Sequence, residues 1–180
     1  MTKEKQLNIE DFIIFKNDDF VAINKPPHVS TLHERQEGAG KGILELLKEV
    51  FPDVQMCHRL DKETSGVLLA ALNPEAYRHA SMAFEHREVT KIYHAVVGGI
   101  HDLKGVQVLL PLLSLPTGIV KVDKLNGKES ETIFNSIEVY RNCTLVECYP
   151  ITGRMHQIRV HLSYLKAPII ADHTYGGKDV

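Results

Sequence analysis

The first half of the chain alternates between short apolar runs and turn-forming residues, which predicts strands, tight turns and a helix. Two apolar runs, residues 13–15 and 20–24, flank a polar Asn-Asp-Asp segment and are typical of a hairpin. Apolar positions at helical spacing in residues 43–50 predict a short amphipathic helix. The continuous apolar run of residues 67–72 predicts a buried strand. The polar loop expected before the helix contains Gly38, Gly40 and Gly42.

The clearest helix signal in the sequence begins at Asn73. An Asn side chain can accept a hydrogen bond from a free N–H group of the first turn, and Pro74 suits the first helical position. Glu75 places a negative charge near the positive end of the helix dipole. We expect this helix to continue to about Glu85.

Strand patterns dominate the second half of the chain. Residues 90–98 alternate well enough for a strand, and residues 145–148 predict another. An Asn-Gly pair at positions 126–127 is typical of a tight turn between strands, here near residues 119–122 and 132–139.

A late helix is expected over residues 154–165. Its apolar face consists of Met155, Ile158, Leu162 and Leu165. Strands outnumber helices and the two do not alternate strictly, so we expect an α+β fold with a largely antiparallel mixed sheet and a few flanking helices. Residues 1–180 are expected to form a single catalytic domain.

Composition excludes several classes of protein. The 180 residues are 43% hydrophobic and 24% charged, which is average for a globular chain and unlike fibrous or disordered sequences. The net charge of −2 excludes a protein that grips RNA by bulk electrostatics. Three cysteines without a C-x-x-C pair indicate a reduced, cytoplasmic protein, and neither a signal peptide nor a membrane span is expected.

The acidic excess is unevenly distributed. Residues 1–56 carry 7 basic and 10 acidic side chains, whereas residues 151–180 carry 4 and 2. A net charge of −2 is therefore compatible with a cleft that is locally positive.

The most informative segment for chemistry is the polar loop around Asp61, which precedes the predicted strand at residues 67–72. The carboxylate lies between cations and is followed by Thr64 and Ser65, whose hydroxyls can fix the loop through side-chain turns. Gly66 permits an unusual backbone dihedral or a close approach. From local chemistry alone, a well-hydrogen-bonded turn capped by Asp61 is the simpler interpretation.

A second segment, at the start of the late helix, carries two arginines and two histidines. Arg154 and Arg159 are five positions apart and do not share a helix face. His156 and His161 have the same spacing and no acidic residue between them, so a zinc site of the H-E-x-x-H kind is not expected. A surface helix with solvated side chains is the competing interpretation.

Two further elements carry single residues of interest. Tyr93 lies among aliphatic residues in a predicted strand, where a tyrosine is more often part of the core than a catalyst. Lys25 ends another predicted strand, and its competing interpretation is a simple loop residue.

Together these segments resemble, in order and spacing, the RluA-type family of RNA pseudouridine synthases. The similarity extends over most of the chain, because five separate motifs contribute to it. They are NKPP at 24–27, HRLDKETSG at 58–66, KIYHAVVGG at 91–99, TGRMHQIRVHL at 152–162 and APIIADHTYGG at 167–177.

The chain departs from the family pattern at two positions and at its ends. His28 and Ala171 stand where the family usually has glycine. We expect the family's carboxyl-terminal tail to be absent, and likewise an amino-terminal RNA-binding module of the ribosomal-protein type.

The resemblance implies a catalytic set of Asp61, Tyr93 and Arg159. Asp61 would be the essential carboxylate, either as nucleophile or as base. Such a group must be ionised in a site that excludes water, so it needs a nearby cation, and the resemblance assigns this role to Arg159. Tyr93 would stack on the uracil and help to move the proton from carbon 5. The isomerisation needs no redox change or energy input, so no cofactor and no metal is expected.

The resemblance also implies an RNA partner whose target base leaves the stack before it reacts. Arg59 would enter the gap or contact a phosphate, and Lys25, Lys62 and Arg154 are weaker candidates for backbone contacts. Ribosomal RNA and transfer RNA stem-loops are both plausible substrates. We expect a monomer.

Two other classes compete with this hypothesis. One is a non-catalytic RNA-binding or ribosome-assembly protein with the same fold, which would have no need of the three catalytic residues together. The other is a metal-dependent hydrolase, suggested by the ten histidines but not by their spacing.

Overall fold

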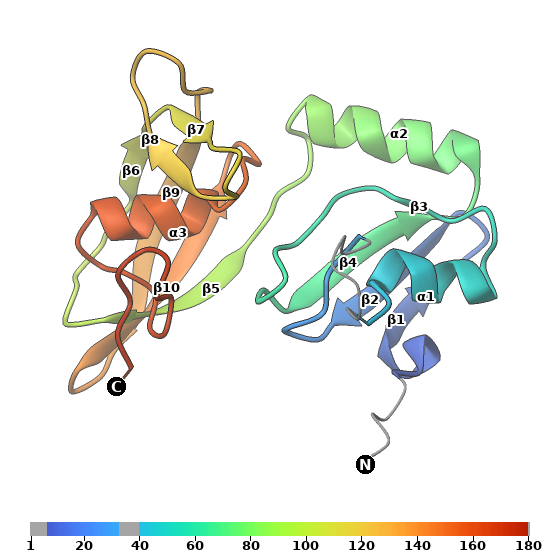
Figure 1. The fold of residues 1–180 in the computed structure, drawn as a ribbon, viewed down its shortest axis with the longest axis horizontal. Helices are drawn as coiled ribbons and strands as arrows, with labels where there is room; N and C mark the ends of the chain where they lie inside the picture. The colour runs from blue at the N-terminus through green and yellow to red at the C-terminus, as the bar shows by residue number, and fades with distance from the viewer. Residues whose placement is uncertain (1–6, 33–39, 180) are drawn as a thin grey trace. The chain divides into compact units, whose positions relative to one another are not determined.

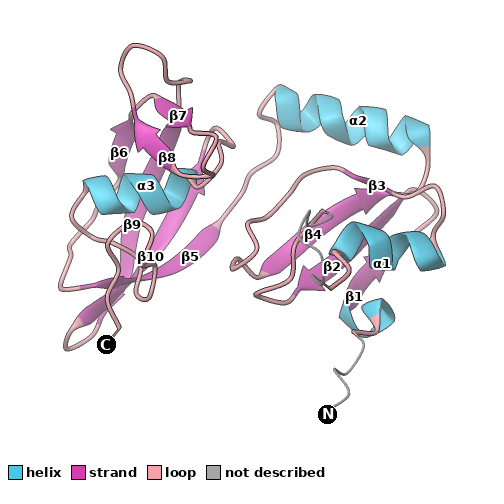
Figure 2. Cartoon of the chain, in the orientation of Figure 1, coloured by secondary structure: helices cyan, strands magenta, loops and turns pink. Residues whose placement is uncertain are grey.

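The computed structural model describes residues 7–32 and 40–179, and the chain divides into two compact units, Met1–Glu88 and Val89–Val180 (Figure 1). Both units combine helices with antiparallel strands, which confirms the predicted α+β class (Figure 2). The single catalytic domain over residues 1–180 stays a prediction. Gly38 of the expected polar loop lies outside the described residues.

The first unit is built on a four-stranded sheet in the order β1-β2-β4-β3, with every neighbouring pair antiparallel. Its elements are a short 3-10 helix Ile9–Phe12, β1 Ile13–Lys16, β2 Phe20–Lys25, α1 Ile43–Val50, β3 Gln55–Met56, β4 Gly66–Ala71 and α2 Pro74–Glu85. Strands β1 and β2 form the predicted hairpin, because the side chain of Asn17 accepts the N–H groups of Asp19 and Phe20 and closes the turn.

Strand β4 is buried on one face, and its other face is exposed at Val67 but buried at Ala71, so the prediction of a buried strand holds except at the start of the strand. Leu68 and Ala70 are 0% exposed, whereas Val67 is 62% exposed. The alternation follows from the period of two in a strand. Register with β2 places Lys25 opposite Gly66, which brings the end of β2 beside the loop that carries Asp61.

Both helices of the first unit occur where local signals predict them. Helix α2 begins at Pro74, where the Asn73 side chain accepts the N–H of Ala76 at 2.9 Å. Helix α1 follows Gly42, whose N–H is bound by the Glu45 carboxylate. A side chain on Gly42 would lie 2.4 Å from a backbone carbonyl, so this position needs glycine.

The second unit contains a four-stranded antiparallel sheet in the order β5-β10-β9-β6, a small hairpin and one helix. Its elements are β5 Tyr93–Gly98, β6 Val106–Leu109, β7 Leu112–Ser114, β8 Val120–Val122, β9 Glu131–Val139, β10 Cys143–Pro150 and α3 Gln157–Tyr164. Strand β10 alternates strictly between partly buried and buried positions, as expected for a central strand with one face on the core.

The turn at residues 126–127 does not join paired strands, so the prediction needs correction. Strand β8 pairs with β7, and β9 pairs with β6 and β10. The carboxylate of Asp123 accepts the N–H groups of Leu125 and Asn126, and its carbonyl accepts that of Gly127. These bonds form a wider loop that directs the chain to β9 without forming a two-residue hairpin.

Helix α3 begins at Gln157, three residues later than the pattern predicts. His156 adopts a left-handed backbone conformation (φ 51°), which a right-handed helix cannot include. Arg154 therefore precedes the helix, and the argument that Arg154 and Arg159 occupy different helix faces does not apply.

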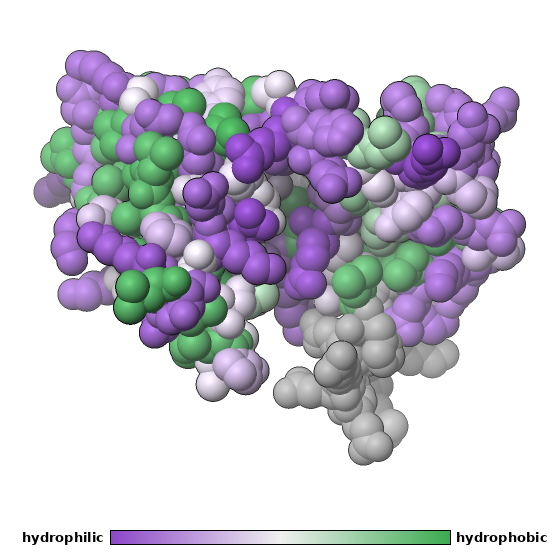
Figure 3. All heavy atoms as spheres, turned by 90° about the horizontal axis from the view of Figure 1, so that it is seen from above, coloured by the Kyte–Doolittle hydropathy of each residue, from purple (hydrophilic) through white to green (hydrophobic). Residues whose placement is uncertain are grey.

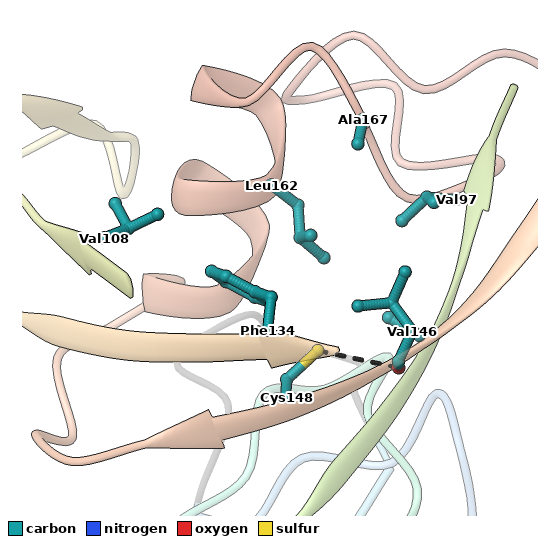
Figure 4. Close-up of a cluster of buried hydrophobic side chains, with 8 residues drawn as sticks. Val97, Val108, Phe134, Val146, Cys148, Leu162 and Ala167 are labelled. Atoms are coloured by element: carbon teal, nitrogen blue, oxygen red, sulfur yellow. Dashed lines mark hydrogen bonds between the residues drawn. The ribbon is translucent and has the colours of Figure 1, made fainter. Parts of the chain in front are cut away.

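The core of the second unit lies between α3 and the sheet. Leu162 of α3 packs among buried side chains of the sheet and of the segment that follows the helix (Figure 4). Val160, also on α3, packs instead against Leu112 and Val120 of the small hairpin. The helix is thus held by the sheet and the hairpin together. The labelled core residues are Val97, Val108, Phe134, Val146, Cys148, Leu162 and Ala167.

Apolar residues also interrupt the polar surface (Figure 3). Leu125 is 92% exposed and Ile100 is 69% exposed. Among the helices of the described part of the chain, none has the length and apolarity needed to cross a bilayer.

Candidate active site

The loop that carries Asp61 is anchored by the residues on either side of it. Leu60 is buried, and both of its backbone groups bind the hydroxyl of Thr31, at 3.2 Å for the N–H and 2.8 Å for the carbonyl. The N–H of Thr64 donates to the carbonyl of Asp61 at 3.1 Å and closes a turn. The side-chain turns expected from Asp61, Thr64 and Ser65 stay a prediction. The partly buried Asp61 lies in a segment that hydrogen bonds hold on both sides.

Lys25 was predicted to contact the RNA backbone, but the structure places its side chain in the interior. Its side chain is fully buried, and its ammonium donates to the carbonyls of Pro26, Val29 and Lys62 at 2.9, 2.7 and 3.0 Å. Burial lowers the pKa of Lys25, and the charges of Glu63 and Asp61 oppose this effect. An ammonium has three N–H donors, and these three carbonyls match them, so Lys25 ties the end of β2 to the Asp61 loop.

His58 and Arg59 precede the catalytic candidate and have different environments. The Nε2 atom of His58 accepts the N–H of Leu69 at 3.0 Å, and its ring lies 4.9 Å from that of Phe84. His58 therefore fixes the loop against β4 and α2. Arg59 is exposed, as is the side chain of Lys62, so both are placed where a phosphate could reach them. Their contact with RNA stays a prediction.

Tyr93 begins strand β5 in the second unit. It is partly buried and alternates with exposed His94, so it lies on the same sheet face as Ala95 and Val97. That face is the one covered by α3, because Tyr93 and Ile158 pack against the same core cluster. Tyr93 and the helix that carries Arg159 thus share one side of the sheet.

Arg159 forms a two-point ion pair with Asp172, a partner that lies 13 residues away in the sequence. The Nε and Nη2 atoms of Arg159 lie 2.7 and 2.9 Å from the two carboxylate oxygens of Asp172. Burial opposes ionisation, but the hydrogen bonds and charge of Arg159, with the N–H groups of Tyr175 and Thr174, hold the pKa of Asp172 below its usual value. This geometry orients the guanidinium plane.

Tyr175 adds a second constraint on Arg159. The guanidinium carbon lies 4.9 Å from the centre of the Tyr175 ring, in a cation–π arrangement. The Tyr175 hydroxyl accepts the N–H of Val120 at 2.9 Å and lies 2.7 Å from Nδ1 of His156. The tautomer of His156 decides which of these two groups donates, and in either case the bond holds the Tyr175 hydroxyl against His156.

A buried chain of polar side chains seats α3 on the sheet. The Gln157 amide donates to the hydroxyl of Thr132 at 2.9 Å, and Thr132 lies 2.9 Å from Nδ1 of His161. Nε2 of His161 lies 2.9 Å from the Ser130 hydroxyl, which donates to the carbonyl of Leu110. Ser130 has no second proton to give, so Nε2 of His161 carries the hydrogen and Nδ1 accepts from Thr132.

Burial dominates the titration of His161. It lowers the pKa of this fully buried side chain to about 4, so the imidazole is neutral at pH 7. His161 and Gln157 therefore act as structural residues beneath α3. Neither belongs to a metal site: within residues 7–32 and 40–179, no group of three or more His, Cys, Asp or Glu is placed to hold a metal ion.

Arg154 lies just before α3 and is exposed. Its Nε donates to the carbonyl of Glu129 at 3.0 Å, and its backbone N–H donates to the Gln157 side chain at 2.9 Å. The side chain is thus attached to the loop before β9, and a phosphate contact by Arg154 stays a prediction.

Comparison with known proteins identifies the family of this chain. The sequence profile described as RNA pseudouridylate synthase matches residues 19–164, which include the Asp61 loop, Tyr93 and Arg159. The chain belongs to the RNA pseudouridylate synthase family. This confirms the resemblance carried by the five motifs.

Curated relatives of the synthase family cover nearly all of this chain. The chain is 38% identical over 178 residues to "Ribosomal large subunit pseudouridine synthase C" of Vibrio cholerae, covering 97% of this chain and 56% of that protein. The protein of the same name from Escherichia coli K12 is 37% identical over 183 residues, with 98% and 56% covered. The chain therefore spans about half the length of these relatives.

A solved structure of the synthase family supports the fold. "Human RNA Pseudouridylate Synthase Domain Containing 4" matches with a TM-score of 0.76 at 28% identity, covering 93% of this chain and 70% of that one. "Human RNA Pseudouridylate Synthase Domain Containing 1" has the same TM-score at 30% identity, with 92% and 69% covered.

The two departures from the synthase pattern now have a backbone explanation. His28 and Ala171 have φ angles of 64° and 60°, in the left-handed region where glycine has no Cβ penalty. The family's glycines suit this conformation, and the side chains here are strained by it. The motif at residues 167–177 drew attention to Ala171, because the family usually has glycine there. The neighbouring Asp172 was not predicted as a site residue.

Sequence reasoning also missed Thr31 and Tyr175. No local pattern identifies the anchor of a loop 29 residues away, which is the separation between Thr31 and Leu60. Asp61 belongs to the first unit, whereas Tyr93 and Arg159 belong to the second. The pairing of Asp61 with Arg159 stays a prediction.

Proposed function

We propose that this protein is an RNA pseudouridine synthase that isomerises specific uridines in structured RNA. The observation that carries the proposal is Asp61, held in a doubly anchored loop within the segment matched by the family profile. The reaction breaks the bond between the ribose and ring nitrogen 1, turns the uracil, and forms a bond from the ribose to carbon 5. The proton of carbon 5 is released and nitrogen 1 gains one, so the atoms balance without a cofactor.

Asp61 is the essential carboxylate of this proposal. It acts as a nucleophile on the uracil or ribose, or as a base on the ribose, and both schemes need the carboxylate at one defined position. The anchors at Leu60 and Lys62 support such a position, because they hold the backbone immediately before and after Asp61.

Tyr93 and Arg159 complete the proposed site. Tyr93 stacks on the detached uracil and assists loss of the carbon 5 proton. Arg159 supplies the positive charge that keeps the catalytic carboxylate ionised where water is excluded.

RNA reaches the site with its target base turned out of the stack, which costs a few kcal/mol and favours loops and bulges. Exposed Arg59 fills the gap or contacts phosphate, and Lys62 and Arg154 contact the backbone. Large-subunit ribosomal RNA is the first substrate to test, because the relatives named above are ribosomal large subunit synthases. A transfer RNA stem-loop is the second. A cytoplasmic monomer stays the expected form.

The test measures tritium released from carbon 5 of uracil in labelled ribosomal and transfer RNA pools. We expect release by the wild-type protein and by Asp53→Asn, an exposed carboxylate of the same unit, and none by Asp61→Asn. RNA affinity should be the same in all three. Absence of release by the wild-type protein from every pool refutes the enzyme and leaves the RNA-binding or ribosome-assembly protein as the alternative.

The substrate is then identified by mapping pseudouridine across total RNA in cells with and without the gene. A uridine modified only when the gene is present identifies the target. If Asp61→Ala removes that modification but leaves the cellular effect of the protein intact, binding is the function that matters.

A further inference from the structure

We infer that Asp172 is a positioning residue for the proposed reaction, which it serves by fixing the orientation of Arg159. The inference rests on the proposed function and deepens it. The side chains of Arg159 and Asp172 are only 17% and 8% exposed, and they meet through two hydrogen bonds of 2.7 and 2.9 Å. Two parallel bonds to a planar group fix its direction as well as its distance.

The side of the guanidinium that Asp172 occupies determines what the rest of Arg159 can do. A guanidinium has five N–H groups, and Asp172 takes that of Nε and one of Nη2. The remaining three lie on Nη1 and Nη2, and one N–H of each nitrogen points to the outer end of the fork. That end can receive a second carboxylate or another oxyanion in two-point geometry. Arg159 is thus able to serve two acids, one as its support and one as its reaction partner.

Tyr175 constrains the plane of the same guanidinium. Its ring lies under Arg159 at 4.9 Å, and its hydroxyl is held at the far end by Val120 and His156. A phenol bound at its hydroxyl cannot swing away from the arginine. Asp172 therefore holds one edge of the Arg159 guanidinium, and the Tyr175 ring packs against its face.

The backbone that carries Asp172 is itself held by hydrogen bonds. Its carbonyl accepts the N–H groups of Tyr175 and Gly177 at 3.1 and 2.9 Å. A side chain at Gly177 would lie 1.9 Å from the carbonyl of Ile169, so only glycine fits there. Ile169 in turn bridges to Val97 of β5, the strand that begins with Tyr93. The segment that carries Asp172 is thereby attached to β5, the strand that carries Tyr93.

If Asp172 is a positioning residue, the effect of substituting it depends on the presence of Arg159. A purely structural residue would show the same effect with or without Arg159. If Asp172 acts through Arg159, Asp172→Asn lowers kcat at least tenfold with little change in KM, because the amide can accept only one of the two N–H groups. In an Arg159→Lys background, the same substitution has less than a twofold effect. Such non-additivity is the mark of residues that act as a unit.

The experiment combines this double-mutant cycle, measured by tritium release, with an NMR readout that does not depend on activity. The Nε–H signal of Arg159 in the full chain should exchange slowly with water in the wild type and fast in Asp172→Asn. The matched control is Asp102→Asn, which removes the same charge from an exposed pair with Lys104 in the same unit. It should leave kcat and the Arg159 signal unchanged. If Asp172→Asn does not fold, Asp172→Glu replaces it, since it keeps the charge and displaces the carboxylate.

The outcomes separate this inference from the proposed function. An unchanged kcat or a slowly exchanging Nε–H in Asp172→Asn overturns the inference, as does an effect of full size in the Arg159→Lys background. If the wild type releases no tritium at all, the proposed function fails. The NMR signal then decides alone whether Asp172 fixes Arg159: loss of protection upholds the positioning, and retained protection overturns it.

Discussion

The buried His161 makes the stability of the second unit depend on pH. Its Nε2–H donates to Ser130 and its Nδ1 accepts from Thr132, so the network is complete with a neutral ring. Protonation adds a hydrogen to Nδ1, where the existing bond needs an acceptor. The ring would then hold a charge at 0% exposure beside a hydroxyl whose own proton has lost its partner.

The magnitude follows from the shift in pKa. The pKa of His161 falls from an ordinary 6.5 to about 4 because burial disfavours the charged ring. Between these values the unfolded chain binds more protons than the folded one, so the free energy of unfolding declines as the pH falls from about 6.5 to about 4. Above pH 7 the contribution is fully present and constant. At about 1.4 kcal/mol per pKa unit, the total loss is about 3 kcal/mol, of which about 2 kcal/mol is lost by pH 5.

The assay is urea unfolding followed by tyrosine fluorescence at pH 7.5 and 5.0. Five of the six tyrosines lie in Val89–Val180 and the chain has no tryptophan, so the signal reports mainly on the second unit. His161→Gln should be less stable than wild type at pH 7.5 by about 1–3 kcal/mol, because Ser130 or Thr132 loses a partner. Its further loss on going to pH 5.0 should be about 2 kcal/mol smaller than that of the wild type.

The matched control for this prediction is His79→Gln, which changes an exposed histidine of α2. It should keep both the stability and the pH dependence of the wild type. If His161→Gln and the wild type lose the same free energy between pH 7.5 and 5.0, the neutral buried imidazole is not the cause and the reasoning is wrong.

Four further substitutions test the anchors and the strained backbone positions of the two units by urea unfolding at pH 7.5. Lys25→Met should destabilise the protein by about 3 kcal/mol, because three buried carbonyls lose a charged donor. His28→Gly and Ala171→Gly should each stabilise it by about 0.5–1 kcal/mol, because relief of the left-handed strain exceeds the entropy cost of glycine. Gly177→Ala should destabilise it by more than about 2 kcal/mol, since the new methyl group would lie 1.9 Å from a carbonyl oxygen.

Each of these substitutions has a matched control in the chain. Lys48→Met changes an exposed lysine of α1 and should alter the free energy of unfolding by less than about 0.5 kcal/mol. Ala83→Gly, within α2, should cost about 1 kcal/mol, opposite in sign to the two glycine substitutions above. Gly153→Ala, where nothing lies within 4 Å of the added methyl group, should be tolerated. Equal effects in a variant and its control would contradict the mechanism assigned to that anchor.

Local signals predicted the elements whose causes are local. Helix α2 begins at Pro74 and ends at Glu85 as expected, because its cap and first turn are contained in three consecutive residues. The β1–β2 hairpin was predicted for the same reason, since Asn17 closes it within three residues. In contrast, α3 begins late because His156 has a left-handed backbone, and the ring of His156 contacts the distant Tyr175, which no helical pattern encodes.

The sequence by itself determined the α+β class, most strand and helix positions and the family, because periodicity, caps and ordered motifs are properties of neighbouring residues. Only the tertiary structure decided which charged side chains are buried and which protein groups replace their hydration. Lys25 became a buried anchor, and Arg159 acquired Asp172 as a partner. Burial and pairing depend on residues far apart in the chain that packing brings together, and the cost of desolvating a charge makes those contacts specific.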